Sequence, residues 1–308
     1  MTQFISDSSL RNLARHIGAS IGRFRYAAMK NWRDWQSIAY MLAVPALAIW
    51  MWIQPDASFI GYWLLLTLIV GVACISHNHA HAPIWRSTVL NGLTDFWIGT
   101  LQGHPVFLFQ PAHIDSHHRY NQGEKDITRV LRYASHNNFL GYLIFPFRVL
   151  PPLNRLKRDY IRTLWHDNRS HFWRVILSHV PLVILWSVTL TIDPYKALIY
   201  VIVPQIVGLH FLLASNYLQH AHALPGSRYN HSRNFTGPIN TVWFNVGYHT
   251  AHHERPRSHW SNLPQLHAAI SDQINPRLNE RSLGYYTIRT MLLGNFVKRF
   301  QSQPVESP

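Results

Sequence analysis

Four apolar segments constrain this chain more than any other feature, because each is long enough to cross most of a lipid bilayer. None contains a charged side chain, and they occupy residues 38–53, 59–76, 175–192 and 197–215. A helix rises about 1.5 Å per residue, so about 20 residues span a hydrocarbon layer of roughly 30 Å. Only short turns separate the members of each pair. The sequence therefore predicts four transmembrane helices in two hairpins.

The basic residues are distributed in a way that sets the expected topology. Twelve Lys and Arg residues lie between residues 77 and 174, nine follow residue 215, and one lies in a hairpin turn. Under the positive-inside rule, such flanks belong on the cytoplasmic side, where anionic lipid attracts them. The formal charge of +14 alone also fits nucleic-acid binding, but its placement beside apolar segments favours a membrane surface. We therefore expect membrane lipid as a partner, and no nucleic acid.

We expect a single all-α integral-membrane domain over residues 1–308, in which a cytoplasmic helical cap carries the polar chemistry. Its parts are a cytoplasmic segment 1–37, the first hairpin 38–76, a cytoplasmic segment 77–174, the second hairpin 175–215 and a cytoplasmic segment 216–308. The apolar stretches 96–109 and 139–150 are interrupted by polar residues, so we expect helices lying in the membrane interface. From about residue 284, the pattern predicts an amphipathic surface helix followed by a disordered tail.

Histidines gather in clusters that fall in the predicted cytoplasmic segments. The four clusters are His77-Asn-His-Ala-His81, His113-Ile-Asp-Ser-His117-His118, Asn216-Tyr-Leu-Gln-His220 and His249-Thr-Ala-His252-His253. Helical residues three or four apart lie on one face with Cβ atoms about 5 to 6 Å apart, so their imidazoles reach a common site. The first cluster follows the second apolar segment, and the third follows the fourth segment. Two membrane helices are therefore expected to carry ligands out of the bilayer.

The doubled histidines in the second and fourth clusters indicate two metal ions. One step along a helix turns by about 100 degrees, so neighbours such as His117 and His118 point toward different ions. Cys74 is the only cysteine, which leaves nitrogen and oxygen as ligand atoms. Imidazole suits iron, copper, zinc or nickel, whereas calcium and magnesium are disfavoured. The residues alone therefore predict a dinuclear metal site at the membrane surface.

These clusters resemble the signature of the membrane fatty-acid desaturase family, which carries HxxxH, HxxHH or HxxxHH, and HxxHH motifs on two membrane hairpins. Three clusters match those motifs one for one, and the stretch GYHTAHHERPRSHW is similar to the context of the family's last motif. The Asn216 and His220 pair resembles a further Asn and His of the family's di-iron site. The resemblance implies no catalytic residue apart from ten metal ligands, which are His77, His81, His113, His117, His118, Asn216, His220, His249, His252 and His253.

The resemblance also implies an activity, that of a non-haem di-iron oxidoreductase with two Fe ions and with O2 as co-substrate. Such enzymes introduce a double bond into a fatty-acyl or other long-chain lipid. This chain has no flavin motif or cysteine cluster, so electrons are expected from a separate donor of ferredoxin, rubredoxin or cytochrome b5 type. The expected setting is the bacterial inner membrane, with a multi-pass chain and an active site on the cytoplasmic side.

The first cluster departs from the family pattern. Asn78 stands where many desaturases carry Asp, and His79 is an additional histidine. Related members hydroxylate lipids, ketolate carotenoids, oxidise alkanes or decarboxylate fatty acids to terminal alkenes, so these outcomes stay open for this chain. A non-enzymatic metal-binding membrane protein is less favoured. Transporters place polar ligands near the bilayer midplane, whereas these clusters gather at one surface.

Carboxylates are expected beside the ligands, because a metal-bound histidine usually donates its other ring N–H to a carboxylate or a carbonyl. The candidates are Asp95, Asp115, Asp126, Asp167 and Glu254. His79 and His222 lie two residues from a predicted ligand, so we expect outer or surface positions for both. Histidines without the cluster spacing, such as His104 and His231, are expected to be structural or solvated.

Overall fold

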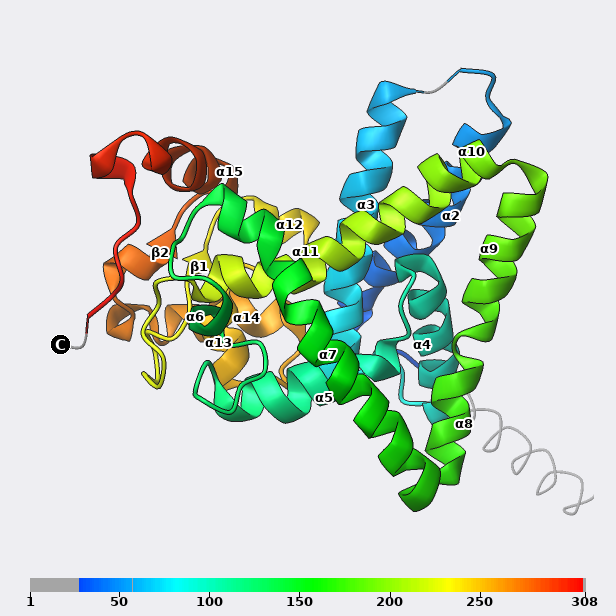
Figure 1. The fold of residues 1–308 in the computed structure, drawn as a ribbon, viewed down its shortest axis with the longest axis horizontal. Helices are drawn as coiled ribbons and strands as arrows, with labels where there is room; N and C mark the ends of the chain where they lie inside the picture. Colours follow the sequence, from blue (N-terminus) through cyan, green and yellow to red (C-terminus); the bar gives the residue numbers. More distant parts are fainter. Residues whose placement is uncertain (1–27, 57, 307–308) are drawn as a thin grey trace, which may run out of the picture.

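The computed structural model describes residues 28–56 and 58–306, and helices dominate it (Figure 1). Four helical stretches are long and apolar enough to cross a membrane, namely Trp32–Ile53, Phe59–His81, Arg169–Ile192 and Pro194–His220. These stretches confirm the predicted four apolar helices and the all-α class. The prediction for residues 1–27 lies outside the described part of the chain. The proposed single domain with its five parts remains a prediction.

The first hairpin consists of α2 (Trp35–Ile53) and α3 (Phe59–His81). The Ser58 hydroxyl accepts a hydrogen bond from the Gly61 N–H at 3.1 Å, which satisfies one of the free donors at the start of α3. Helix α3 is the central element of the bundle, since it packs against α2, α4 and α11. It continues beyond the predicted apolar segment and so carries the whole first histidine cluster.

The second hairpin contains a break in its first arm. Its first arm is divided into α8 (Arg169–Leu177) and α9 (Val180–Ile192), and its second arm comprises α10 (Pro194–Ala197), a π-helical turn Leu198–Ile202 and α11 (Val203–His220). The break lies at His179, whose Nδ1 is 3.0 Å from the Val175 carbonyl oxygen. At the far end, the Lys196 ammonium donates to the Trp52 carbonyl at 2.6 Å and so joins α10 to the end of α2.

Two helices outside the spans differ in extent from their predictions. Of the stretch expected at 96–109, only residues 96–102 are in α4 (Thr88–Gln102), which begins earlier, ends earlier and packs among α2, α3, α9 and α11. The stretch expected at 139–150 is the start of α7 (Phe139–Asp167), which continues through Pro146, Pro151 and Pro152. Proline removes backbone hydrogen bonds, which is why the sequence favours an earlier end. Figure 1 shows α7 running past α5 toward the start of α8.

The remaining elements are short, and among them α5 and α6 contact α7. They are α5 (Gln110–Ala112), a π-helical turn His113–His118, α6 (Val130–Tyr133), β1 (Asn234–Phe235), α12 (Ile239–Val242), α13 (His249–Glu254), α14 (Leu263–Ala268), β2 (Asn279–Glu280) and α15 (Leu283–Tyr286). A continuous helical run covers residues 283–295, as α15 is followed directly by a π turn and a 3-10 turn, so a helix lies close to where the sequence predicts it. Its position on the membrane surface remains a prediction. The predicted disorder of the tail is wrong at Val305, which is buried and donates its N–H to the His222 carbonyl.

Candidate metal centre

Four separate parts of the chain bring nine histidines together. They are the end of α3, the π turn His113–His118, the end of α11 and helix α13. The nine rings form two groups, and within each group the possible ligand atoms all lie within 4.8 Å of one another. The five-histidine group consists of His77, His81, His113, His118 and His252. The four-histidine group consists of His117, His220, His249 and His253.

This division separates the adjacent histidines as the sequence predicts. His117 and His118 belong to different groups, and so do His252 and His253. The groups also touch, because the His118 and His253 rings stack with their centroids 4.4 Å apart. The geometry is therefore that of two neighbouring sites and not of one large cluster.

The π turn changes one expectation about spacing. In a regular α-helix, residues five apart point about 140 degrees away from each other, whereas residues four apart share a face. The wider turn instead brings His113 and His118 together, with their Nε2 atoms 3.0 Å apart, and sends His117 to the other group. Single π turns inside helices are frequent at functional sites.

Ring nitrogens converge inside the five-histidine group. The Nε2 atom of His118 lies 3.0 Å from the Nε2 atoms of both His113 and His252. The Nε2 atom of His81 is buried and has no hydrogen-bond partner among the described residues. A neutral imidazole has one donor and one acceptor nitrogen, so converging acceptors repel unless a cation or a proton lies between them. The donor set therefore fits a metal ion.

The four-histidine group shows the same convergence. The Nε2 atom of His249 lies 3.0 Å from that of His220 and 3.1 Å from that of His253. The Nε2 atoms of His117 and His253 are 3.2 Å apart. His117, His220 and His249 are buried, so water is largely kept from these nitrogens. This group also has the donor chemistry of a metal site.

Hydrogen bonds on the outer side of three rings set their tautomers. The Nδ1 of His117 lies 2.9 Å from Asp126 Oδ2, and the Nδ1 of His220 lies 2.7 Å from the His231 carbonyl oxygen. The Nδ1 of His77 lies 3.2 Å from Asn78 Oδ1. Each Nδ1 donates to an oxygen, so each Nε2 keeps its lone pair for the centre of the group.

Asp126 is held more firmly than any other carboxylate near the site. It is fully buried and accepts hydrogen bonds from the Gln122 N–H, the Thr128 N–H and the Thr128 hydroxyl at 2.8 to 2.9 Å. Burial acts to raise the pKa of Asp126, but the hydrogen bonds from His117, Thr128 and Gln122 outweigh it and lower that pKa. The residue is therefore an anionic acceptor behind His117, as the sequence predicts.

Among the described residues, none of the other four carboxylates forms a hydrogen bond or an ion pair with the nine histidines, which corrects the prediction for them. Asp95 lies 3.5 Å from His79, and burial raises the pKa of Asp95 to about 7. Glu254 forms a salt bridge of 3.1 Å with Arg228. Asp115 and Asp167 are exposed, because they point outward from the π turn and from the end of α7. Whether a carboxylate contacts the histidines depends on its burial and on its partners in the folded chain. Spacing along the sequence does not indicate either property.

Burial also favours the neutral form of five of the histidines. It lowers the pKa values of His249, His252 and His253 well below 6.5, and the neighbouring imidazoles lower them further. The same two causes lower the pKa values of His113 and His118. These rings are therefore neutral at pH 7, which is the form that binds a metal ion.

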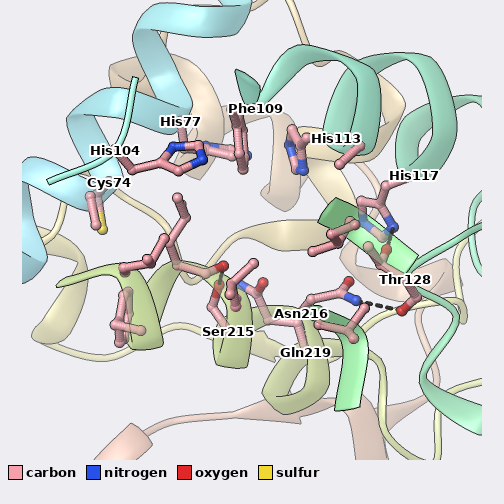
Figure 2. Close-up of a pocket in the computed structure, with 18 of the residues that line it drawn as sticks. Cys74, His77, His104, Phe109, His113, His117, Thr128, Ser215, Asn216 and Gln219 are labelled. Carbon is pink, nitrogen blue, oxygen red and sulfur yellow. Dashed lines mark hydrogen bonds between the residues drawn. The ribbon is translucent and has the colours of Figure 1, made fainter. Parts of the chain in front are cut away.

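Asn216 faces the histidines from α11, across a cavity (Figure 2). Its Nδ2 donates to the Thr128 carbonyl at 2.7 Å, and its Oδ1 accepts from Gln122 Nε2 at 3.4 Å. The side chain is therefore tied to the same segment that holds Asp126. Its role as a ligand remains a prediction.

The cavity beside the histidines has a volume of about 290 Å³. Its walls are mostly apolar and come largely from α3, α7 and α11, with side chains such as Ala73, Phe145, Val149 and Leu212, and Phe109 adds to them from just before α5. In Figure 2, His104 and Cys74 lie on one side of the view, Thr128 and His117 lie on the other, and His77 and His113 lie between them. An apolar cavity that passes a metal site suits a hydrocarbon chain.

Sequence reasoning missed two contributors to the site. One is His231, which is fully buried and supplies a backbone carbonyl to His220 while its own ring lies 4.9 Å from that of His253. The other is Gln122, whose backbone and side chain hold Asp126 and Asn216. Every residue type carries a backbone carbonyl, so the sequence does not indicate that residue 231 supplies one to His220. The one hint for Gln122 is its position four residues before Asp126.

Comparison with known proteins identifies the family of this chain. Residues 57–283 match the fatty acid desaturase family. The chain belongs to that family. It is 24% identical over 234 residues to sphingolipid delta(4)-desaturase DES1 of Mus musculus, which covers 72% of this chain and 67% of the mouse protein. Against the Xenopus tropicalis DES1, identity is 24% over 262 residues, which is 78% of this chain and 74% of that protein.

A third relative carries a broader name. Sphingolipid delta(4)-desaturase/C4-monooxygenase DES2 of Rattus norvegicus is 25% identical over 260 residues, or 75% of this chain and 76% of the rat protein. The family match confirms the resemblance stated from the motifs. This desaturase-family protein is an integral membrane di-iron oxidoreductase that acts on a lipid. Its two histidine groups are consistent with the di-metal site of the family.

Proposed function

We propose that this desaturase-family enzyme introduces a double bond into a fatty-acyl chain, with O2 as co-substrate and one iron ion in each histidine group. The observation that carries the proposal is the division of nine buried or half-buried imidazoles into two touching groups beside an apolar cavity. Bound iron supplies oxygen-dependent oxidation of unactivated C–H bonds. Iron is selected from the metals that imidazole suits by the family match, not by ligand softness.

The residues of this chain prepare the site in three ways. Asp126 and the His231 carbonyl orient His117 and His220, so their Nε2 lone pairs face inward. Burial lowers the pKa values of His249, His252 and His253 and so keeps these rings neutral. Apolar walls exclude water and align a long chain, which limits oxidation to the carbons that lie opposite the histidines. Asn216 is proposed as the tenth ligand, through its side-chain oxygen or a bound water.

Electrons are proposed to come from a separate protein of ferredoxin, rubredoxin or cytochrome b5 type. The basic flanks support a cytoplasmic position for the site, under the positive-inside rule. We infer a bacterial inner membrane as the setting, and this inference rests on the sequence pattern alone. Reconstitution with each type of donor tests this part, because only a competent donor sustains repeated turnover.

Hydroxylation is the second candidate, and the name of one relative favours it over ketolation, alkane oxidation and decarboxylation. The rat relative is named as both a desaturase and a C4-monooxygenase. In this chain, Asn78 accepts from His77 with a neutral amide oxygen in place of the Asp that many desaturases carry. A neutral acceptor makes the ligand less basic and so changes the electronic environment of the metal. The names of these relatives also make a sphingolipid chain a second candidate substrate.

Product analysis tests the proposal directly. The chain is expressed in a bacterial host fed defined fatty acids, and the lipids are analysed by mass spectrometry with and without oxygen. Desaturation removes two hydrogens, hydroxylation adds one oxygen, and decarboxylation removes the carboxyl group. New double bonds that require oxygen and disappear in a His118→Ala control support the proposal. Products that are unchanged by that control, or that form without oxygen, contradict it.

A further inference from the structure

A polar pair lies on the wall of the otherwise apolar cavity. The Lys157 ammonium donates to Nε2 of His104 at 2.6 Å, and both side chains line the cavity. Burial, and then the neighbouring Lys157, lower the pKa of His104, so its ring is neutral and acts as the acceptor. Neither residue belongs to the two histidine groups. The pair is therefore a second polar feature of the cavity, separate from the metal centre.

Within the described part of the chain, no Asp or Glu forms an ion pair with Lys157, so its charge has no counterion there. A half-buried ammonium has three donors, and its hydrogen bond to the neutral His104 ring uses one of them. Charges inside proteins are usually paired, because leaving water is costly for an isolated ion. Burial lowers the pKa of Lys157 to about 8, so the ammonium form predominates at pH 7.

Helix α7 leads from this pair along the cavity. Phe145, Val149, Leu153 and Lys157 are four residues apart and all line it, so one face of the helix forms a continuous wall. At 1.5 Å per residue, Phe145 and Lys157 are about 18 Å apart along the helix. The wall is apolar up to its last member, which carries a positive charge. Its polarity matches a long hydrocarbon with one acidic end.

We propose that Lys157 and His104 bind the carboxylate of an unesterified long-chain fatty acid whose hydrocarbon chain extends along the α7 wall past the histidine groups. This inference rests on the proposed function, since it names the substrate class of that site. A compact anion uses the two remaining ammonium donors. A neutral ester, alcohol or amide head leaves the Lys157 charge unpaired, so the pair discriminates against such lipids.

The position of the pair also bears on the product. Both residues lie outside the histidine groups, so in the inferred pose the carboxylate is bound by Lys157 and His104 and not by the predicted metal ligands. Carbons within the chain then face the histidines. The inferred pose therefore favours an internal double bond with the carboxyl group retained over a terminal alkene.

Equilibrium binding to the purified, metal-loaded enzyme in detergent tests the proposal. The probe is radiolabelled hexadecanoic acid, and the competitors are hexadecan-1-ol, methyl hexadecanoate and hexadecanoyl-CoA. The acid is expected to bind at least about 10-fold more tightly than the alcohol, the ester or the thioester. Lys157→Met should weaken acid binding about 30-fold or more, as expected for loss of one partner of a buried charge pair, and leave alcohol binding within about twofold.

Two control variants distinguish loss of the Lys157 charge from loss of the folded structure. Arg158→Gln removes the next positive charge on α7, which is exposed, and should preserve the preference for the acid. Lys157→Arg keeps the charge and should also preserve it. If Lys157→Met fails to fold, the Arg variant decides, and loss of the acid preference with alcohol binding retained overturns the proposal. Equal binding of acid and alcohol to the wild-type enzyme overturns it as well.

The outcome separates this inference from the proposed function. Oxygen-dependent double bonds formed equally well from acid, ester and alcohol keep the desaturase activity and overturn the role of Lys157. A strong acid preference that depends on Lys157, without any oxygen-dependent product, keeps the carboxylate site and overturns the desaturase assignment.

Discussion

The two histidine groups differ in how the protein holds them. In the four-histidine group, three rings are buried, and two are anchored from behind by Asp126 and the His231 carbonyl. In the five-histidine group, four of the rings are only half-buried, and His77 makes its outer bond to the neighbouring Asn78. Buried hydrogen-bond partners therefore hold the rings of the four-histidine group in position, whereas the five-histidine group has one more imidazole available to bind an ion.

This difference predicts that replacing one histidine weakens metal binding more in the four-histidine group than in the five-histidine group. A site with five imidazoles retains four after one substitution, which is enough for a stable metal complex. A site with four retains three, and its geometry then depends entirely on the outer hydrogen bonds. The five-histidine group should therefore retain its ion better, although both ions are needed for the reaction.

The largest effect is expected from removing one ring of each group. His118→Ala and His253→Ala should both abolish the oxygen-dependent product, a loss beyond the roughly 10 to 100-fold typical of an outer partner. Metal analysis should distinguish the two variants, because His253→Ala loses the ion of its group while His118→Ala retains most of its metal. Membrane insertion, measured by fractionation, should be unchanged in both. Equal metal loss in the two variants contradicts the comparison.

Removing the outer anchor is expected to have the next largest effect. Asp126→Asn leaves too few acceptor oxygens for the donors that converge on it, so His117 loses its orientation. Activity or metal affinity should fall about 10 to 100-fold, with the loss confined to the four-histidine group. Asp115→Asn is the matched control, because that exposed carboxylate lies on the same π turn as His117. If Asp115→Asn lowers activity or metal affinity as much as Asp126→Asn does, Asp126 is not a specific anchor of His117.

Acid should destabilise the metal-free protein through rings of both groups. The pKa values of His113 and His118 in one group, and of His249 and His253 in the other, are lowered below 6.5 in the folded state. Below that value the unfolded chain binds more protons, so stability is full above about pH 6.5 and falls as the pH drops. For one ring, a folded-state pKa that is lower by one corresponds to about 1.4 kcal/mol of unfolding free energy.

Thermal unfolding in detergent at about pH 7.5 and about pH 5.5 measures this effect. The melting temperature of the chelator-treated protein should be lower at the acidic pH. The metal-loaded protein should melt higher at both values, because an ion that binds only the folded state stabilises it. A melting temperature that stays constant or rises on acidification contradicts the burial of these rings.

The smallest effect is expected at Glu254, which follows His253 directly. Its carboxylate pairs with Arg228 near the surface, and such pairs contribute roughly 0 to 1 kcal/mol. Glu254→Gln should therefore change activity and metal content by no more than about twofold. A loss comparable to that of Asp126→Asn reveals an anchoring role that its contacts do not indicate.

Much of this arrangement is predictable from the sequence, for local reasons. The apolar segments report the four spans, because length and hydrophobicity are properties of consecutive residues. The division of the doubled histidines between two groups follows from helical rotation alone. The bounds of the helices do not follow in the same way, since α7 continues through three prolines whose lost hydrogen bonds the surrounding structure tolerates.

The unpredicted features depend on tertiary structure. The π turn is a choice of hydrogen-bond register, so the sequence does not indicate that His113 pairs with His118. Five carboxylates are equal candidates in the sequence, and only burial distinguishes Asp126. The contact of His104 with Lys157 joins residues 53 positions apart, on α7 and just after α4. No spacing rule connects such positions.

Metal analysis of the purified wild-type protein tests the central claim most directly. Elemental mass spectrometry of protein from an iron-supplied host should find about two iron ions per chain, one for each histidine group. A value near one iron, or zinc or nickel in place of iron, contradicts a di-iron site shared between the five-histidine and four-histidine groups.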